Sequence, residues 1–325
     1  MALTIWTNGK FTPAATQLLH EGTRAHRLIT AETATASVLV AGKPDPELAK
    51  ADIAFGQPDP ADCLRNSGIK WVEVSSAGYT RYDTPEFLEG FRARGSAFTN
   101  ASGVFADPCA QHVLAMILAL NRQLLPSHND QITDQSWHYT ERRYDSRLLT
   151  GQTVLMLGYG AIGRRLTELL APFGVTLYAL RRQTRSETGV RIVAETELTR
   201  ILPLVDHIVN ILPANPATDG YVNARRLACC RPSAKFYNVG RGSTVDQGAL
   251  AEALRTGKLA GAYLDVTEPE PLPPTHELWK TPNCYITPHT AGGRHDQDEM
   301  IVQHFLSNLA AFERGENGAM TDRVA

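Results

Sequence analysis

Three short segments in the second half of the chain carry side chains with complementary chemistry. Arg241 lies in Asn-Val-Gly-Arg-Gly-Ser-Thr-Val-Asp, Glu270 in Asp-Val-Thr-Glu-Pro-Glu-Pro, and His289 in Thr-Pro-His-Thr-Ala-Gly-Gly. They supply a permanent cation, a carboxylate, and the type of side chain that changes charge near neutral pH. Singly, each has an ordinary explanation: a surface ion pair, a solvated loop charge and a hydrogen-bonded turn residue. They are therefore the residues of this chain that could do chemistry.

A glycine-rich segment stands between an apolar run and a helical pattern. The run Thr-Val-Leu-Met-Leu enters Gly158-x-Gly160-x-x-Gly163, and Arg-Arg-Leu-Thr-Glu-Leu-Leu-Ala follows at once. This strand–turn–helix context is typical of a dinucleotide site, in which the glycines permit a tight turn, approach of a pyrophosphate, and close helix–strand packing. The N–H groups at the start of the helix then face the anion. We expect cofactor contacts from Gly158, Tyr159, Gly160, Ala161, Ile162 and Gly163.

The end of the next predicted strand indicates which nucleotide is bound. A site that selects NAD carries Asp or Glu about 20 residues after the glycines, where it binds the ribose 2′-hydroxyl. After the predicted strand 175–179 this chain has Leu-Arg-Arg, with Arg181 and Arg182 in place of an acid. A guanidinium can make paired hydrogen bonds with a 2′-phosphate, although these arginines could also be a solvated strand end. We expect NADP as the cofactor, with NAD as the alternative.

The segments around these motifs alternate β-type and helical patterns, as in α/β folds with parallel sheets. In the first hundred residues, strands are predicted at 3–6, 38–41, 53–55, 71–74 and 97–99, and helices at 13–20, 60–66 and 84–94. After residue 149, strands are predicted at 154–157, 175–179, 191–193, 208–212, 235–239, 262–266 and 285–286. Long helices are predicted at 103–124 and 297–312. The fold class is therefore α/β, with two doubly wound parallel-sheet domains.

The amino-acid composition argues against nucleic acids and acidic membranes as partners. The 325 residues contain 32 Lys and Arg against 34 Asp and Glu, so a broad basic surface for nucleic acid or acidic membranes is not expected. The apolar run at 113–120 is too short to cross a bilayer, and the first residues lack the basic-then-apolar pattern of a signal peptide. Five cysteines without a CxxC pair fit reduced thiols in the cytoplasm. We predict a cytoplasmic protein without a metal site.

Together these motifs resemble the D-isomer-specific 2-hydroxyacid dehydrogenase family over nearly the whole chain. The markers are the glycine fingerprint, Ser-Ser-Ala-Gly at 75–78, Val-Gly-Arg-Gly at 239–242, Leu-Asp-Val at 264–266 with Glu-Pro at 270–271, and Thr-Pro-His at 287–289. The resemblance implies a Rossmann cofactor domain, residues 101–289, inserted into a flavodoxin-like substrate-binding domain, residues 1–100 plus 290–325. It also implies that the C-terminal helix returns to the first domain, and that the protein is a homodimer.

The resemblance further implies a role for each matching residue. Arg241 would bind the carboxylate and carbonyl oxygen of a 2-oxo acid, and His289 would protonate that oxygen as hydride arrives. Glu270 would hold the imidazole and favour its charged form. Substrate binding is expected from Ser76, Ala77, Gly78, Arg241 and His289. Further cofactor contacts are expected from Leu212, Pro213, Val239, Gly240 and Asp265, the last to the nicotinamide carboxamide.

Some positions depart from the family pattern. Ala161 stands where Arg is frequent in the fingerprint, and Ala106 and Gln111 stand where Thr and Glu are frequent. Arg181 replaces the usual acid, as in the NADP-using glyoxylate and hydroxypyruvate reductases of the family. We therefore expect an NADP-dependent reductase that acts on glyoxylate or hydroxypyruvate.

Two alternatives stay open at this level. One is a NAD-dependent dehydrogenase of another D-2-hydroxy acid, such as 3-phosphoglycerate or lactate, with Arg81 as a basic residue beside the loop 75–82. The other is a dinucleotide-sensing protein similar to the corepressors of the family. Which acid is used, in which direction, and how strictly NADP is preferred do not follow from the sequence. The polar segment 126–146, with Trp137, could be a dimer arm or a plain surface loop.

Overall fold

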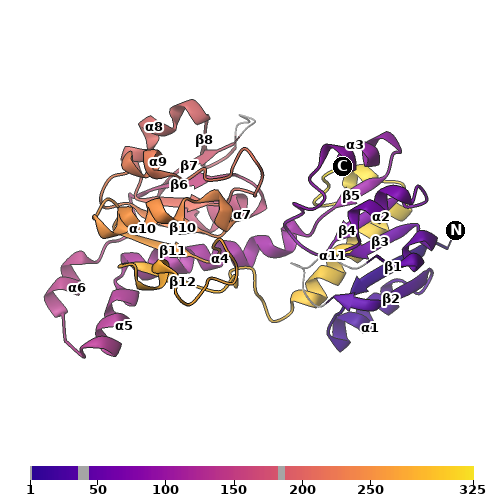
Figure 1. Cartoon of the computed structure of the whole chain (residues 1–325), viewed down its shortest axis with the longest axis horizontal. Helices are drawn as coiled ribbons and strands as arrows, with labels where there is room; N and C mark the ends of the chain where they lie inside the picture. The colour runs from indigo at the N-terminus through magenta and orange to yellow at the C-terminus, as the bar shows by residue number, and fades with distance from the viewer. Residues whose placement is uncertain (1, 36–43, 182–186) are drawn as a thin grey trace. The chain divides into compact units, whose positions relative to one another are not determined.

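The computed structural model describes residues 2–35, 44–181 and 187–325 (Figure 1). The chain forms two compact units, Met1–Phe105 with Arg294–Ala325, and Ala106–Gly293. Both ends of the chain therefore build the first unit, and the middle of the chain builds the second. The strand predicted at 38–41 lies outside the described residues.

The first unit contains a five-stranded parallel sheet in the order β2-β1-β3-β4-β5. This is the flavodoxin-like order, which confirms the predicted fold class. The edge strand β2 was not predicted, because its sequence Arg-Leu-Ile-Thr-Ala-Glu-Thr-Ala-Thr lacks an apolar run. The strands are β1 (Thr4–Gly9), β2 (Arg27–Thr35), β3 (Ile53–Gly56), β4 (Trp71–Val74) and β5 (Ala97–Thr99).

Local sequence determines where the helices of this sheet begin. Helices α1 (Pro13–Gly22), α2 (Pro60–Arg65) and α3 (Pro85–Ala93) each start at a proline. The residue before each proline, Thr12, Asp59 or Thr84, accepts a hydrogen bond from an N–H group of the first turn. A capping oxygen followed by proline suits a helix start, because proline lacks an N–H group that would otherwise need a partner.

The second unit contains a seven-stranded parallel sheet in the order β12-β11-β10-β9-β6-β7-β8. Chain order runs in opposite directions on the two sides of β6, so a topological switch point lies between β6 and β9, where α/β proteins bind ligands. The strands are β6 (Thr153–Leu157), β7 (Thr176–Leu180), β8 (Arg191–Val193), β9 (His207–Asn210), β10 (Lys235–Asn238), β11 (Gly261–Leu264) and β12 (Cys284–Ile286). The helices are α4 (Ser102–Asn121), α5 (Leu124–Thr133), α6 (Tyr139–Asp145), α7 (Ala161–Leu170), α8 (Leu198–Ile201), α9 (Ala224–Ala228) and α10 (Gln247–Arg255).

Helix α4 packs on one face of this second sheet. By length and composition alone this 20-residue helix could cross a membrane, since a window of 18 of its residues has a mean hydropathy of 1.5. The apolar run at 113–120 is too short to cross a bilayer, but the helix that contains it begins at Ser102 and is therefore longer than that run. Here His112 hydrogen-bonds the Tyr263 hydroxyl at 2.7 Å, and Asn121 hydrogen-bonds Gln152 at 2.7 Å, while Val113 and Ile117 are fully buried. These contacts are those of a core helix.

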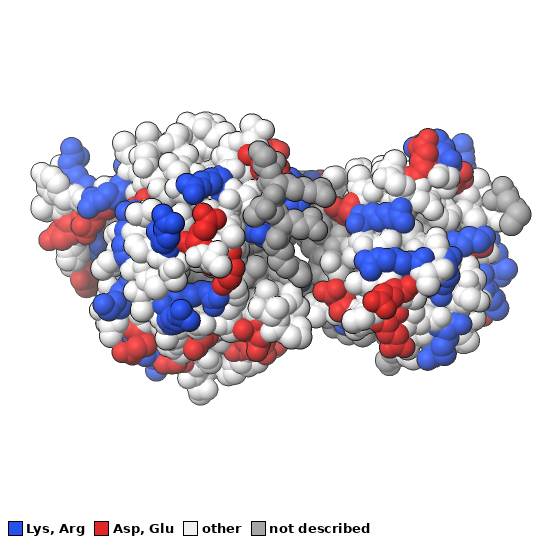
Figure 2. Space-filling model, turned by 90° about the horizontal axis from the view of Figure 1, so that it is seen from above, with Lys and Arg blue, Asp and Glu red and all other residues white. Residues whose placement is uncertain are grey.

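Charges of both signs are interspersed over the visible face of the protein. Figure 2 shows Lys and Arg beside Asp and Glu on both units, outside the grey residues. Such mixed patches screen one another and produce no extended field of one sign on this face.

The C-terminal helix α11 (Gln297–Glu313) covers one face of the first sheet, which confirms the predicted return of the chain. The Phe305 ring stacks on Phe55 at 4.1 Å and on Trp71 at 5.1 Å between centroids. Beside these rings, the fully buried carboxylate of Glu73 accepts hydrogen bonds from Thr99, His304 and Asn308. A buried carboxylate is tolerated only when it is bonded in this way.

His304 lies between two carboxylates. Its Nδ1 contacts Glu73 Oε1 at 3.0 Å, and its Nε2 contacts Asp322 Oδ2 at 3.1 Å. Burial alone would lower the pKa of His304, but hydrogen bonds and charge from Asp322 and Glu73 raise its pKa from 6.5 to about 9. A protonated His304 therefore joins β4, α11 and the C-terminal residues.

We predict that this ion cluster makes the stability of the first unit depend on pH. Because the folded-state pKa lies above the unfolded value, the stabilisation is complete below pH 6.5 and is lost as pH rises through about 9. A shift of this size corresponds to about 3 kcal/mol. His304→Gln should lower the free energy of unfolding in urea at pH 6 and flatten its decline toward pH 9.5. The exposed His20→Gln is the control, and equal pH profiles for wild type and His304→Gln would contradict the assignment.

Candidate active site

Most of the residues expected to bind the cofactor lie at the carboxyl edge of the second sheet. The glycine fingerprint follows β6, Arg181 follows β7, Leu212 and Pro213 follow β9, Val239 and Gly240 follow β10, and Asp265 follows β11. Because all seven strands are parallel, these positions share one edge of the sheet, beside the switch point. Arg182 lies outside the described residues.

The fingerprint has the geometry that a dinucleotide phosphate group requires. Gly158 has a φ of +96°, and a Cβ atom there would lie 3.1 Å from the carbonyl oxygen of Ile211, so only glycine fits. Gly160 precedes α7 without a side-chain cap, and a Cβ atom there would meet nothing within 4 Å. The N–H groups of the first helical turn are therefore open to an anion. The Tyr159 side chain is buried, with its hydroxyl 3.4 Å from Thr167 Oγ1.

Arg181 is paired with a carboxylate that the sequence did not place beside it. Its Nη1 donates to Glu187 Oε1 at 2.7 Å, and both side chains are partly exposed. Glu187 is six positions further along the chain, so a search limited to the strand end passes over it. Among the described residues, the end of β7 therefore presents the guanidinium of Arg181 paired with the carboxylate of Glu187.

Buried amides set the position of the Arg241 loop. Asn210 Nδ2 donates to Asn238 Oδ1 at 3.0 Å and to Thr244 Oγ1 at 2.7 Å. Asn238 Nδ2 and Thr244 Oγ1 in turn donate to the Arg241 carbonyl oxygen, at 3.1 and 2.6 Å. Gly242 lies directly against the Glu270 loop, since a Cβ atom there would be 2.0 Å from the Thr267 carbonyl carbon. The two loops are thus held in contact.

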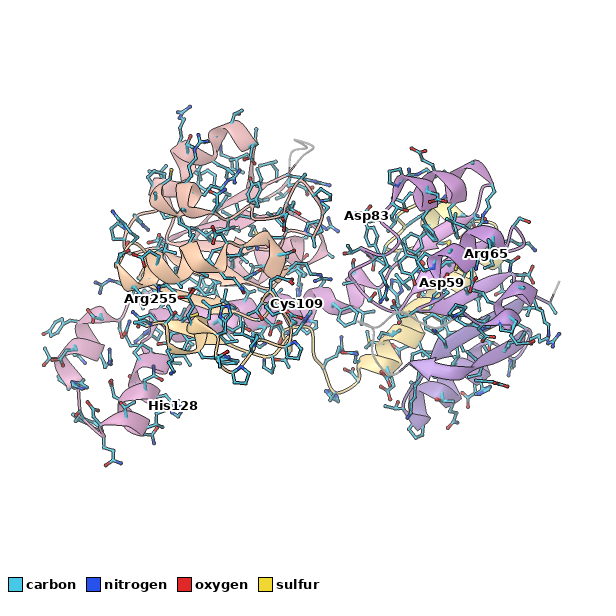
Figure 3. All side chains as sticks on the ribbon, viewed as in Figure 1. Asp59, Arg65, Asp83, Cys109, His128 and Arg255 are labelled. Atoms are coloured by element: carbon cyan, nitrogen blue, oxygen red, sulfur yellow. The ribbon has the colours of Figure 1, made fainter. Side chains whose placement is uncertain are left out.

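Arg241 is a largely buried cation. Burial lowers its pKa, and the nearby carboxylate of Glu270 acts in the opposite direction. Its Nη1 donates to the Gly240 carbonyl oxygen at 2.7 Å, which leaves other donors of the guanidinium for a ligand. Cys109, labelled on α4 in Figure 3, has its pKa raised to about 12 by burial and by Asp265, so it is a neutral thiol here.

His289 and Glu270 form a direct pair. The Nδ1 atom of His289 lies 2.8 Å from Glu270 Oε2, and Glu270 Oε1 accepts the Thr267 N–H at 3.0 Å. Nδ1–H therefore points at the carboxylate, and Nε2 is the nitrogen left for other chemistry. His289 has a φ of +55°, a conformation uncommon outside glycine that is found at functional sites. Its backbone N–H donates to the Asp265 carbonyl oxygen at 2.8 Å.

Asp265 organises the turn that carries His289. The carboxylate is buried and accepts hydrogen bonds from Thr287 Oγ1 at 2.5 Å, Thr290 N at 2.8 Å and Ala291 N at 2.9 Å. A carboxylate with three such donors is rigidly placed. The Tyr263 hydroxyl on β11 lies 3.4 Å from the same carboxylate.

The expected substrate loop belongs to the first unit, after β4. Ser76 Oγ donates to the Gly78 carbonyl oxygen at 2.7 Å, and Asn100 Nδ2 donates to the Ala77 carbonyl oxygen at 2.8 Å. Within the described parts of the chain, the N–H groups of Ala77 and Gly78 make no hydrogen bond. Successive free backbone N–H groups form a concavity suited to an anion.

The sequence did not single out the residues that position this site. Asn210, Asn238 and Thr244 hold the Arg241 loop, and Tyr263 with Thr287 supports Asp265. A buried polar residue at the last position of a strand, directly after apolar or aromatic residues, as at Asn210 and Asn238, is the signal that could have identified them.

Comparison with known proteins places the chain in a family. A family model described as "D-isomer specific 2-hydroxyacid dehydrogenase, NAD binding domain" matches residues 114–291. Human glyoxylate reductase/hydroxypyruvate reductase is 33% identical over 232 residues, which are 70% of each chain. A D-isomer specific 2-hydroxyacid dehydrogenase from Xanthobacter autotrophicus, solved with NADPH, is 25% identical with a TM-score of 0.80, covering 100% of this chain and 98% of that one. An NADPH-dependent glyoxylate/hydroxypyruvate reductase from Sinorhizobium meliloti, solved with NADP and malonate, is 26% identical with a TM-score of 0.73, covering 100% and 97%.

The chain therefore belongs to the D-isomer-specific 2-hydroxyacid dehydrogenase family. It is an oxidoreductase that uses a nicotinamide dinucleotide and a small hydroxy or oxo acid. The family resemblance, the fold class and the enzyme class expected from the sequence are confirmed.

We predict that Gly242→Ala separates the Arg241 and Glu270 loops, because a methyl group would overlap the Thr267 backbone. A misplacement of about 1 Å can reduce turnover on the order of 10²-fold. Steady-state kcat/KM for 2-oxo acid reduction measures the effect. Gly248→Ala, at an exposed position of helix α10, is the matched control and should keep full activity. Unchanged kcat/KM in a folded Gly242→Ala enzyme would refute the close packing.

Proposed function

We propose that the protein is an NADP-preferring reductase of a small 2-oxo acid, with glyoxylate and hydroxypyruvate as the best substrates. The observation that carries the proposal is the His289–Glu270 pair, with Glu270 close enough to oppose the effect of burial on the Arg241 pKa. Relatives named glyoxylate/hydroxypyruvate reductase support the choice of acid. A panel of 2-oxo acids assayed with NADPH and NADH tests it. Highest kcat/KM on a bulky 2-oxo acid would overturn the substrate assignment.

In the proposed mechanism, each of the three residues has one task. The forked guanidinium of Arg241 binds the substrate carboxylate and carbonyl oxygen. The free N–H groups of Ala77 and Gly78 in the first unit are also assigned to substrate binding. The bound dinucleotide supplies the hydride to the carbonyl carbon. The Nε2–H of His289 gives a proton to the carbonyl oxygen, and Glu270 stabilises the imidazolium before transfer. In the reverse direction, neutral Nε2 accepts the proton from the hydroxyl.

We assign the glycine fingerprint to the pyrophosphate of the dinucleotide. The residues after β9 and β10 lie at the same edge of the sheet and are assigned to the rest of the dinucleotide. Leu212, Pro213, Val239 and Gly240 follow neighbouring strands, and a Cβ atom at Gly240 would lie 2.7 Å from the Leu212 carbonyl oxygen. We assign these residues to cofactor contacts, with Asp265 fixing the His289 turn beside the nicotinamide. On this proposal the second unit is the cofactor domain, and the first unit is the substrate domain.

We also propose that the protein works as a cytoplasmic homodimer. Helices α5 and α6 project from the second unit, where His128 is labelled (Figures 1 and 3). Exposed apolar side chains are concentrated on and beside these helices, and such patches mark interaction surfaces. A solution mass twice the 35.6 kDa of one chain would support the dimer, and a monomer mass would exclude it. The exposed side chains are Leu124, Ile132, Trp137, Tyr139, Tyr144 and Leu148.

The proton transfer is tested with two conservative variants. Reduction needs the imidazolium and oxidation needs the neutral ring, so reduction should fall at high pH and oxidation at low pH. His289→Gln should lose on the order of 10²–10⁴-fold in kcat, the contribution of a positioned acid or base, while retaining NADPH affinity. Glu270→Gln keeps a hydrogen-bonding group but removes the charge beside the imidazole, so kcat for reduction should fall less than in His289→Gln, with NADPH affinity retained. Near-normal turnover of His289→Gln would end the proposal.

The nucleotide preference is tested at the end of β7. If Arg181 binds the 2′-phosphate, Arg181→Asp should weaken NADPH binding by about 1.5–3 kcal/mol, the value of a charged hydrogen bond. Glu187→Gln is the matched variant: it removes the competing carboxylate, so NADPH affinity should hold or rise. Affinities for both nucleotides can be measured by fluorescence titration. If NADPH bound more weakly to Glu187→Gln and equally well to Arg181→Asp, the preference for NADPH over NADH would not come from Arg181.

A further inference from the structure

A cavity of about 500 Å³ opens at the amino-terminal edge of the second sheet, opposite the edge that carries the catalytic residues. Gln152, Asp206 and Lys235 contribute the starts of β6, β9 and β10 to its wall, and Arg142 and Arg147 contribute helix α6 and the segment after it. Strands of four or five residues span roughly 15 Å, so the cavity is separate from the active site. Its volume is within the usual range of small-molecule sites.

Lys235 is a half-buried cation without a carboxylate partner in the described parts of the chain. Its Nζ donates to Asn121 Oδ1 at 3.0 Å, which uses one of three donors. Burial, with the charges of Arg147 and Arg231, lowers the pKa of Lys235. Arg147 donates to the carbonyl oxygens of Tyr144 and Ser146, and it too has no ion-pair partner among the described residues.

The groups behind Lys235 are neutral. The Asn121 amide donates to Gln152 Oε1 at 2.7 Å, and Gln152 Oε1 also lies 2.7 Å from His207 Nε2. Burial, with the charge of Lys235, lowers the pKa of His207 to about 3, so its ring is uncharged and Nε2–H donates to Gln152. The Tyr237 hydroxyl completes the chain at 3.0 Å from His207 Nδ1. Among the described residues, this hydrogen-bonded chain therefore contains no negative charge that could balance Lys235.

The carboxylates near the cavity are mostly engaged by other cations. Asp206 pairs with Arg231 and accepts the Thr153 N–H, and Asp130 pairs with Arg142 at 2.6 Å. Asp145 also lies on the wall. The Nε atom of Arg231 is buried without a hydrogen-bond partner among the described residues. The four cations Arg142, Arg147, Arg231 and Lys235 thus exceed the three carboxylates.

We propose that this cavity is a second ligand site, which binds a small multivalent oxyanion bearing phosphate or carboxylate groups. The free donors of Lys235 and the guanidinium of Arg147 bind the anion, and Arg142 closes the site from α6. Since Arg142 belongs to the projecting helices and Lys235 to the sheet, the ligand joins α5 and α6 to the strand edge. Occupancy therefore stiffens these helices without touching the catalytic residues.

Calorimetric titration of the full-length protein tests the site. Pyrophosphate and citrate are titrated separately, with saturating NADP to fill the dinucleotide site, into wild type, Lys235→Met, Arg147→Gln and Arg241→Gln. We expect one site per chain, with affinity reduced roughly tenfold or more in Lys235→Met and in Arg147→Gln. Affinity should be unchanged in Arg241→Gln and in the exposed control Lys10→Met. Binding of only one probe identifies the phosphate or the carboxylate source.

Hydrogen exchange gives a second readout. The bound probe should slow amide exchange in α5 and α6 of the wild type and of Lys10→Met, but not of Lys235→Met. If Lys235→Met does not fold, Arg147→Gln decides the question alone. Absence of binding by both probes, equal affinity in the cavity variants, or loss of binding in Arg241→Gln overturns the proposal.

Discussion

The carboxylate of Asp265 is the constraint on which the active site depends. It receives donors from Thr287, Thr290 and Ala291, so the turn between β12 and the first unit is folded around one buried charge. The turn puts His289 in a left-handed backbone conformation and directs its ring to Glu270. These hydrogen bonds are short and two of the three donors are backbone N–H groups. The position of the imidazole is therefore set before any ligand binds, as preorganised sites require.

Sequence patterns predicted the fold well for segments whose own residue pattern indicates whether they are buried. Buried parallel strands are short apolar runs, and the runs at β4 and β5 were predicted with their observed bounds. The fingerprint could be assigned because its glycines, its strand and its helix are contiguous. The edge strand β2 was missed because it is rich in threonine and carries Arg and Glu, so its burial signal is weak. Helices α5 and α6 were left open between an arm and a loop for the same reason, since neither has a buried residue.

The catalytic candidates could be named from the sequence, but their geometry could not. Arg241, Glu270 and His289 are far apart in the chain, and parallel strands bring the loops that carry them to one edge. What holds them is non-local: Asn210, at the end of β9, donates to Thr244 in the segment that follows the neighbouring strand β10. Pairings of this kind depend on register and loop path, which no local pattern encodes.

The division of the first unit between both ends of the chain has a consequence for synthesis. Residues 1–105 emerge from the ribosome before the whole second unit, whereas α11 is made last. Until then Glu73 has neither His304 nor Asn308, and the rings of Phe55 and Trp71 lack Phe305. A carboxylate cannot be buried without those partners. The second unit can therefore complete its sheet on the nascent chain while the first unit stays open on one face until α11 is made. Pulse proteolysis of arrested nascent chains would reveal this order.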